Sequence, residues 1–215
     1  MVITEGGLES SRRPEWVIVI GANTGGPQAL SALLPQFPPS FPGTVVVVQQ
    51  MRPGFTRVLV DQLSHICHMP VYEPEEGRAL QAGRILVVPS TSRLKIGNLS
   101  DDAAPAYSVL LENVIGAPEL RHSRVDCAME SAAKLFGRRS VGILLTGVGS
   151  DGCEGMRAIS TAGGITIAQD EATSVVHSLP LSAIEAGVAA HVLPLWNIAD
   201  YVVDITGGTT YAAAA

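Results

Sequence analysis

Five short runs of apolar, mostly β-branched residues recur along the chain and constrain its fold more than any other feature. The runs are WVIVI (16–20), TVVVVQQ (44–50), RILVVP (84–89), SVGILLT (140–146) and GITIAQ (164–169). Each is continuous rather than alternating with polar residues, which is typical of parallel strands buried on both faces. Stretches with helical spacing lie between them, at 27–34, 56–66, 125–136, 155–162 and 181–186. This alternation predicts an α/β fold with a doubly wound, mostly parallel sheet and helices on both faces.

The predicted domain runs from residue 16 to residue 205, over which the composition is even. Residues 1–15 are predicted to be a flexible leader and residues 206–215 a tail. Between Val71 and Leu111 the sequence is richer in turns, and LKIG and YSVLL predict an antiparallel hairpin at the edge of the sheet.

Charge and hydropathy exclude several classes of protein. Acidic residues outnumber basic ones by 20 to 14, for a net charge of −6, so we expect no nucleic-acid partner. No apolar run reaches the ~18 residues of a membrane span, and the polar amino terminus lacks a secretory stretch, so we expect a cytoplasmic protein without membrane insertion. The three cysteines show no metal-ligand spacing, and we expect no metal and no cofactor.

Polar or glycine-rich segments follow three of the predicted strands, where the site of an open α/β sheet is expected. These segments are GANTGGP (21–27), QQMRPGFT (49–56) and TGVGSDG (146–152). Each also has a plain structural interpretation: a tight turn, a polar strand end, and a helix N-cap at Asp151. The amides of the first turn are a candidate anion or oxyanion site.

Taken together, GANTGGP, QQMRPGFT, TGVGSDGCEGM (146–156) and AQDEATSVV (168–176) resemble the catalytic domain of the CheB family, the chemotaxis receptor methylesterases. The resemblance covers residues 16–205. It implies a doubly wound α/β domain with a Ser-His-Asp triad that hydrolyses glutamyl methyl esters on the cytoplasmic helices of chemoreceptors and deamidates certain glutamines. The receiver domain that family members usually carry is not expected in this chain.

The site departs from the family pattern at two of the three triad positions. The family has serine where this chain has Asn23 and histidine where it has Gln50, and only the acid remains, as Asp151. An asparagine amide is a very weak nucleophile, and a glutamine amide has no useful basicity near neutral pH. We therefore predict a domain with impaired catalysis that acts as a binding or regulatory module. We also predict that Gln50 donates to Asp151 and accepts from Asn23, which makes a triad-shaped chain of hydrogen bonds.

The remaining candidate site residues follow from the same segments. Thr24, Gly25, Val148 and Gly149 are the candidate turn and oxyanion residues, and Met51, Arg52, Phe55, His122 and His177 are the candidate rim. The expected partners are chemoreceptor cytoplasmic helices or other chemosensory proteins.

Two alternatives stay open. The first is a working esterase or deamidase with a rearranged site, using Thr24, Cys153, His122 or His177. The second is a small-molecule or anion binder that uses the turn at 21–26.

Overall fold

The computed structural model describes residues 12–98, 107–117 and 123–207, and it confirms the predicted fold class. Seven parallel strands form the main sheet in the order β3-β4-β2-β1-β7-β8-β9. Their bounds are β1 (Trp16–Ala22), β2 (Gly43–Gln49), β3 (Val71–Tyr72), β4 (Arg84–Val87), β7 (Ser140–Leu144), β8 (Ile165–Gln169) and β9 (His191–Leu193). The order runs outward from β1 in both directions, so the sheet is doubly wound with its switch point at the centre.

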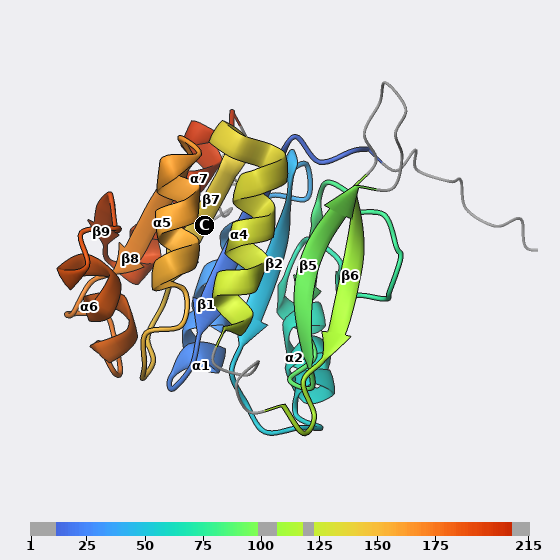
Figure 1. The fold of residues 1–215 in the computed structure, drawn as a ribbon, viewed down its shortest axis with the longest axis horizontal. Helices are drawn as coiled ribbons and strands as arrows, with labels where there is room; N and C mark the ends of the chain where they lie inside the picture. The colour runs from blue at the N-terminus through green and yellow to red at the C-terminus, as the bar shows by residue number, and fades with distance from the viewer. Residues whose placement is uncertain (1–11, 99–106, 118–122, 208–215) are drawn as a thin grey trace, which may run out of the picture.

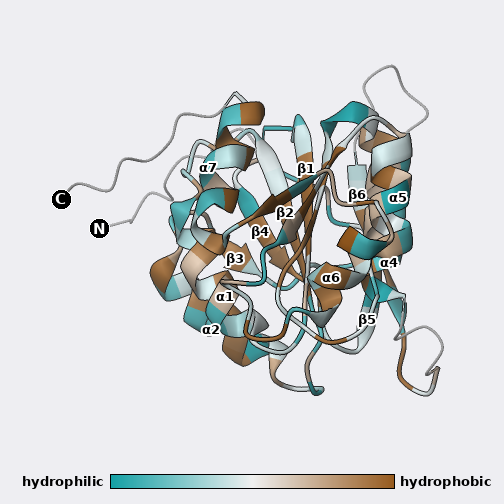
Figure 2. Ribbon diagram, turned by 90° about the vertical axis from the view of Figure 1, so that its left-hand side faces the viewer, coloured by the Kyte–Doolittle hydropathy of each residue, from teal (hydrophilic) through white to brown (hydrophobic). Residues whose placement is uncertain are grey.

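Helices cover both faces of this sheet. They are α1 (Gly26–Leu33), α2 (Thr56–Ile66), α4 (Arg124–Phe136), α5 (Cys153–Thr161), α6 (Ser178–Glu185) and α7 (Leu195–Ile205), with short 3-10 turns at Leu34–Gln36 and Gly137–Arg139. Figure 2 shows α1, α2 and α7 on one side of the sheet and α4 and α5 on the other.

The side chains of β1 show how the two cores form. Ile18 and Ile20 pack into the cluster that contains the apolar faces of α1, α2 and α7. Val17 and Val19 point the other way, into the cluster that includes α4 and α5. Because successive strand residues face opposite sides, a continuous apolar run is needed to fill both cores.

The predicted antiparallel hairpin is present, and it forms a sheet of its own. Strands β5 (Ser92–Asn98) and β6 (Tyr107–Asn113) pair antiparallel as a separate two-stranded sheet, rather than extending the edge of the main sheet. Its buried side chains Leu94, Ile96 and Val109 join the cluster beside α4 and the α4-side face of β2 and β4 (Figure 1). The hairpin is therefore held by the packing of its apolar face on the domain. Among the described residues, it makes no strand pairing with the main sheet.

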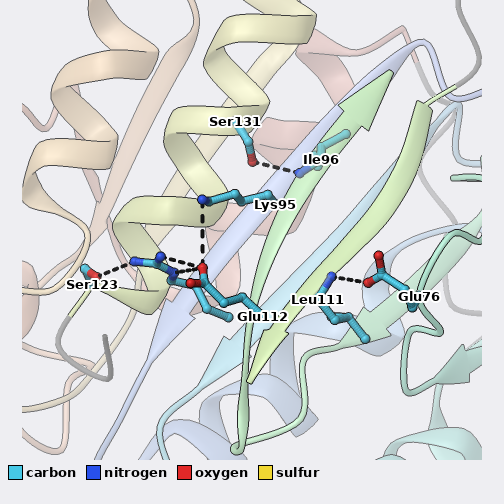
Figure 3. Close-up of polar contacts among 8 residues, drawn as sticks. Glu76, Lys95, Ile96, Leu111, Glu112, Ser123 and Ser131 are labelled. Carbon is cyan, nitrogen blue, oxygen red and sulfur yellow. Dashed lines mark hydrogen bonds and ion pairs between the residues drawn. The ribbon is translucent and has the colours of Figure 1, made fainter. Parts of the chain in front are cut away.

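Polar contacts fasten the hairpin to α4 (Figure 3). The backbone amide of Ile96 donates to Ser131 Oγ at 3.0 Å. Arg93 donates through Nη1 to Ser123 Oγ at 3.2 Å and through Nε to Glu112 Oε2 at 3.1 Å. The bond to Ser131 holds the hairpin to the middle of α4, the bond to Ser123 holds it to the start of α4, and the bond to Glu112 joins the two hairpin strands.

No described helix is long and apolar enough to cross a membrane.

Candidate functional site

The carboxyl ends of the three central strands bring together the polar side chains that the sequence analysis selected. Asn23 follows β1 and Gln50 follows β2, while Asp151 lies in the loop between β7 and α5. The amide of Asn23 donates to Thr146 O at 3.1 Å, and the amide of Gln50 donates to Ala22 O at 2.9 Å. These backbone bonds extend the strand register by one residue and set the side chains at a common edge.

The predicted chain of side-chain hydrogen bonds is present in the predicted direction. Asn23 Nδ2 donates to Gln50 Oε1 at 2.9 Å, and Gln50 Nε2 donates to Asp151 Oδ2 at 3.1 Å. The Asn23 amide also donates to the carbonyl of Val148 at 3.0 Å. Gln50 therefore accepts on one side and donates on the other, as a neutral histidine between a hydroxyl and a carboxylate would.

Asp151 is held by the first turn of α4. Its carboxylate accepts from the backbone amides of Arg124, Val125 and Asp126, each at 3.1 Å, and its residue is only 8% exposed. Asp151 therefore does not cap the helix that follows it in sequence, whose N-cap is Gly152. An ionised carboxylate can only accept hydrogen bonds. The Gln50 side chain therefore has to turn its amide nitrogen, not its oxygen, toward Asp151.

Asp126 returns the same contact. It lies in the first turn of α4 and its Oδ1 accepts from the amides of Gly152 at 2.9 Å and Gly155 at 2.8 Å, at the start of α5. Asp151, in the loop before α5, thus binds amides at the start of α4, and Asp126, in α4, binds amides at the start of α5; the two contacts join the two helix starts.

Burial changes the acidity of the charged groups in this region. It raises the pKa of Asp151 to about 6, against the opposing effect of the hydrogen bonds that the carboxylate accepts. Burial likewise raises the pKa of Asp126. Arg124 is 3% exposed, and burial lowers its pKa to about 10, while the charge of Asp151 opposes that fall. The Arg124 guanidinium donates to the carbonyls of Ser92 and Pro89, both at 2.8 Å.

The raised pKa of Asp151 predicts a definite pH dependence of stability. The pKa of this carboxyl is about 6 in the folded chain, above its ordinary value of 3.8. Folding therefore favours the protonated form. The resulting stabilisation is complete below about pH 4 and is lost as the pH rises through about 6. Relative to the Asp151→Asn variant, we expect the free energy of unfolding to fall by about 1–3 kcal/mol across that window. Urea denaturation at several pH values measures it, and parallel curves for the two proteins would contradict it.

Gln49 is a site residue that the sequence analysis did not single out. Its side chain is buried, and Nε2 donates to the carbonyls of Asn23 at 2.9 Å and Gln50 at 2.8 Å. A Cβ on Gly26 would lie 1.9 Å from Gln49 Oε1, so only glycine leaves room for this side chain. The available signal was a polar residue in the last, fully buried position of an apolar strand.

The glycine-rich turn lies directly beside Asn23. Gly25 has a φ of 81°, and a Cβ there would meet Val175 at 2.8 Å, so this position requires glycine. No described residue accepts from the backbone amides of Thr24 and Gly25. These amides are the donors available to a developing oxyanion or a bound anion.

The predicted rim is only partly described. Met51 packs against the core, Arg52 is exposed, and Phe55 is 57% exposed. Val148 and Gly149 are exposed as well. His177 immediately precedes α6, and its Nε2 is buried without a hydrogen-bond partner among the described residues. His122 lies outside the described residues.

The cysteine proposed as a substitute nucleophile is not activated. The Sγ of Cys153 lies 3.2 Å from Ser182 Oγ, and burial raises the pKa of the thiol. A raised pKa leaves less thiolate at neutral pH, and thiolate is the nucleophilic form. Among the described residues, no group of three or more His, Cys, Asp and Glu side chains could hold a metal ion.

Comparison with known proteins gives one consistent result. The family model described as CheB methylesterase matches residues 18–202. A protein-glutamate methylesterase/protein-glutamine glutaminase 1 from Carboxydothermus hydrogenoformans is 41% identical over 186 residues, which cover 86% of this chain and 54% of that protein. A protein of the same kind from Moorella thermoacetica is 39% identical, over 96% of this chain and 48% of its own length. The chain thus spans about half the length of these curated relatives.

A solved structure agrees with the sequence comparison. The crystal structure of the Thermotoga maritima CheB methylesterase catalytic domain superposes with a TM-score of 0.82 at 32% identity. The match covers 88% of this chain and 98% of that domain.

Proposed function

Because this chain belongs to the CheB methylesterase family, we propose that it is a chemosensory domain that binds the family's substrate region but barely hydrolyses it. Its reaction class is hydrolysis of glutamyl methyl esters, and its substrate would be the cytoplasmic helices of chemoreceptors. On this proposal the chain works in the cytoplasm as a binding or regulatory module.

One observation supports the proposal: Asn23 Nδ2 donates to Gln50 Oε1 at 2.9 Å, and the family resemblance implies that these are the positions of the nucleophile and the base. Hydrolysis through a triad needs a hydroxyl that loses its proton to an imidazole and an imidazole that passes it to the leaving alcohol. Neither amide can do this near neutral pH. The free amides of Thr24 and Gly25 can still stabilise an oxyanion, which leaves a background rate but no acid–base step.

Docking is the activity that this arrangement can preserve. Arg52 and Phe55 lie between β2 and α2, beside the site, and both are exposed. A large exposed aromatic side chain next to an arginine is a common anchor in protein interfaces. We place the receptor-binding surface around these two residues.

The test measures binding and methanol release on the same methylated chemoreceptor fragment. We expect the chain to bind the fragment and to release methanol at close to the uncatalysed rate. Arg52→Ala and Phe55→Ala should each weaken binding by about tenfold without changing the denaturation midpoint, because both side chains are exposed. Arg138→Ala, an exposed arginine beside the amino end of β7, is the matched control and should bind as the parent does.

The outcomes separate the alternatives. Methanol release far above background by the parent chain would favour a rearranged working site, with Thr24 and His177 as the described groups to test first. Failure of the parent to bind any receptor fragment, or unchanged binding after both substitutions, would contradict the docking surface.

A further inference from the structure

A cavity lies at the opposite end of the sheet from the site. Its volume is about 320 Å³. The lining residues come from the segment before β1, the start of β6, the end of α4 and the 3-10 turn before β7: Arg13, Pro14, Glu15, Tyr107, Leu135, Phe136 and Arg139. Because the strands are parallel, the amino ends of β1 and β7 place this cavity far from Asn23 and Asp151.

Two arginines from distant parts of the sequence face this cavity. Arg13 is fixed in place, since its Nη2 donates to Tyr107 Oη at 3.0 Å and its guanidinium lies 4.8 Å from the centre of the Tyr107 ring. Among the described residues, no ion pair involves Arg13 or Arg139, although Glu15 also lines the cavity. Two guanidinium groups on one cavity, neither of them in an ion pair with a described residue, favour an anionic ligand.

Part of the remaining wall is apolar. The rings of Tyr107 and Phe136 lie 4.2 Å apart, and Tyr107 Oη donates to the carbonyl of Leu135 at 3.4 Å. Together with Pro14 and Leu135, these rings provide apolar surface that a ligand with an apolar body can cover. The cavity therefore joins charged groups to an aromatic surface, and its volume falls in the usual range of small-molecule sites.

We propose that this cavity binds a small organic anion: one phosphate or carboxylate joined to an apolar or aromatic body. Arg13 and Arg139 would hold the anion, and Leu135, Tyr107 and Phe136 would contact the body. This site is independent of the function proposed above and uses none of its residues.

The test titrates four probes into the protein and follows its backbone amide signals by NMR. Phenyl phosphate and benzoate carry both parts of the proposed ligand and differ in the anion. Inorganic phosphate carries only the anion, and phenol only the ring. We expect either phenyl phosphate or benzoate to bind at least about tenfold more tightly than inorganic phosphate and phenol, with shifts centred on residues 135–139. Which of the two binds better identifies the anion.

Paired variants locate the binding. Arg13→Gln and Arg139→Gln should each weaken binding by about tenfold or more, since each removes a charge-assisted hydrogen bond. Arg12→Gln and Arg138→Gln are matched controls: they remove the neighbouring charge without touching the cavity, and they should leave binding unchanged. Equal weakening by the controls, equal affinity for inorganic phosphate, or shifts elsewhere in the chain would each overturn the proposal, as would no binding at about 10 mM probe.

Discussion

The double variant Asn23→Ser with Gln50→His is expected to release methanol from a methylated chemoreceptor fragment at least about 100-fold faster than the parent chain. The structure supplies the geometry for this gain. Gln50 already accepts from residue 23 and donates to Asp151, and a neutral imidazole can take over both bonds. The acid, the turn amides and the supporting Gln49 contacts stay as they are.

The single variants provide the first control. Asn23→Ser alone has a hydroxyl without a base, and Gln50→His alone has a base without a nucleophile. Because groups in a triad act as a unit, each single variant should stay close to the parent rate. Adding Asp151→Asn to the double variant should remove most of the gain, since the acid holds the imidazole in its productive tautomer.

Two results would contradict this account of the site. A folded double variant that binds the fragment but releases no more methanol than the parent would show that more than the two triad positions has been lost. A single variant as active as the double variant would show that the chain already supplies a nucleophile or a base.

Replacement of Asp151 by alanine is expected to lower the free energy of unfolding by about 3–5 kcal/mol. The reason lies in the fold rather than in catalysis. The substitution leaves the buried amides of Arg124, Val125 and Asp126 without their acceptor. It also removes a negative charge that favours the charged form of the buried Arg124 guanidinium. Urea denaturation at neutral pH measures the loss.

Asp61→Ala is the matched control for this prediction. Asp61 pairs with Arg57 on the surface of α2, and both side chains are largely exposed. Its removal should cost at most about 0.5 kcal/mol. If the Asp151 and Asp61 variants lose the same amount, the contacts between Asp151 and α4 do not stabilise the fold.

The sequence predicts the main sheet well because five of its strands are long enough to be recognised by their continuous apolar, β-branched residues. The predicted helices at 27–34, 56–66, 125–136, 155–162 and 181–186 also correspond to α1, α2, α4, α5 and α6 within a few residues. Strands β3 and β9 escape notice because they are two and three residues long, too short for a pattern. Helix α7 was not singled out either, although its apolar residues Ile198, Val202 and Val203 are buried.

The site shows the same division between local and distant information. The strand ends point to Asn23, Gln50 and Asp151, because parallel strands bring their carboxyl ends to one edge. The contact between Asp151 and α4 cannot be predicted from the sequence, because the amides that donate to Asp151 belong to residues about 25 positions earlier. For a related reason, the sequence predicts the hairpin but not that it forms a separate sheet: the pattern of β5 and β6 shows an apolar face but not the surface that covers it.

The two reciprocal contacts of Asp151 with the start of α4 and of Asp126 with the start of α5 have a consequence for how such a domain can change over evolutionary time. Both contacts hold helix starts, so selection for a folded protein alone is enough to retain the two aspartates. The side chains of Asn23 and Gln50 bond to each other, to the carbonyl of Val148 and to Asp151, and neither binds the amides of a helix start among the described residues. An aspartate at position 151 is therefore not evidence of an active enzyme. The residues at positions 23 and 50 are the ones that bear on activity.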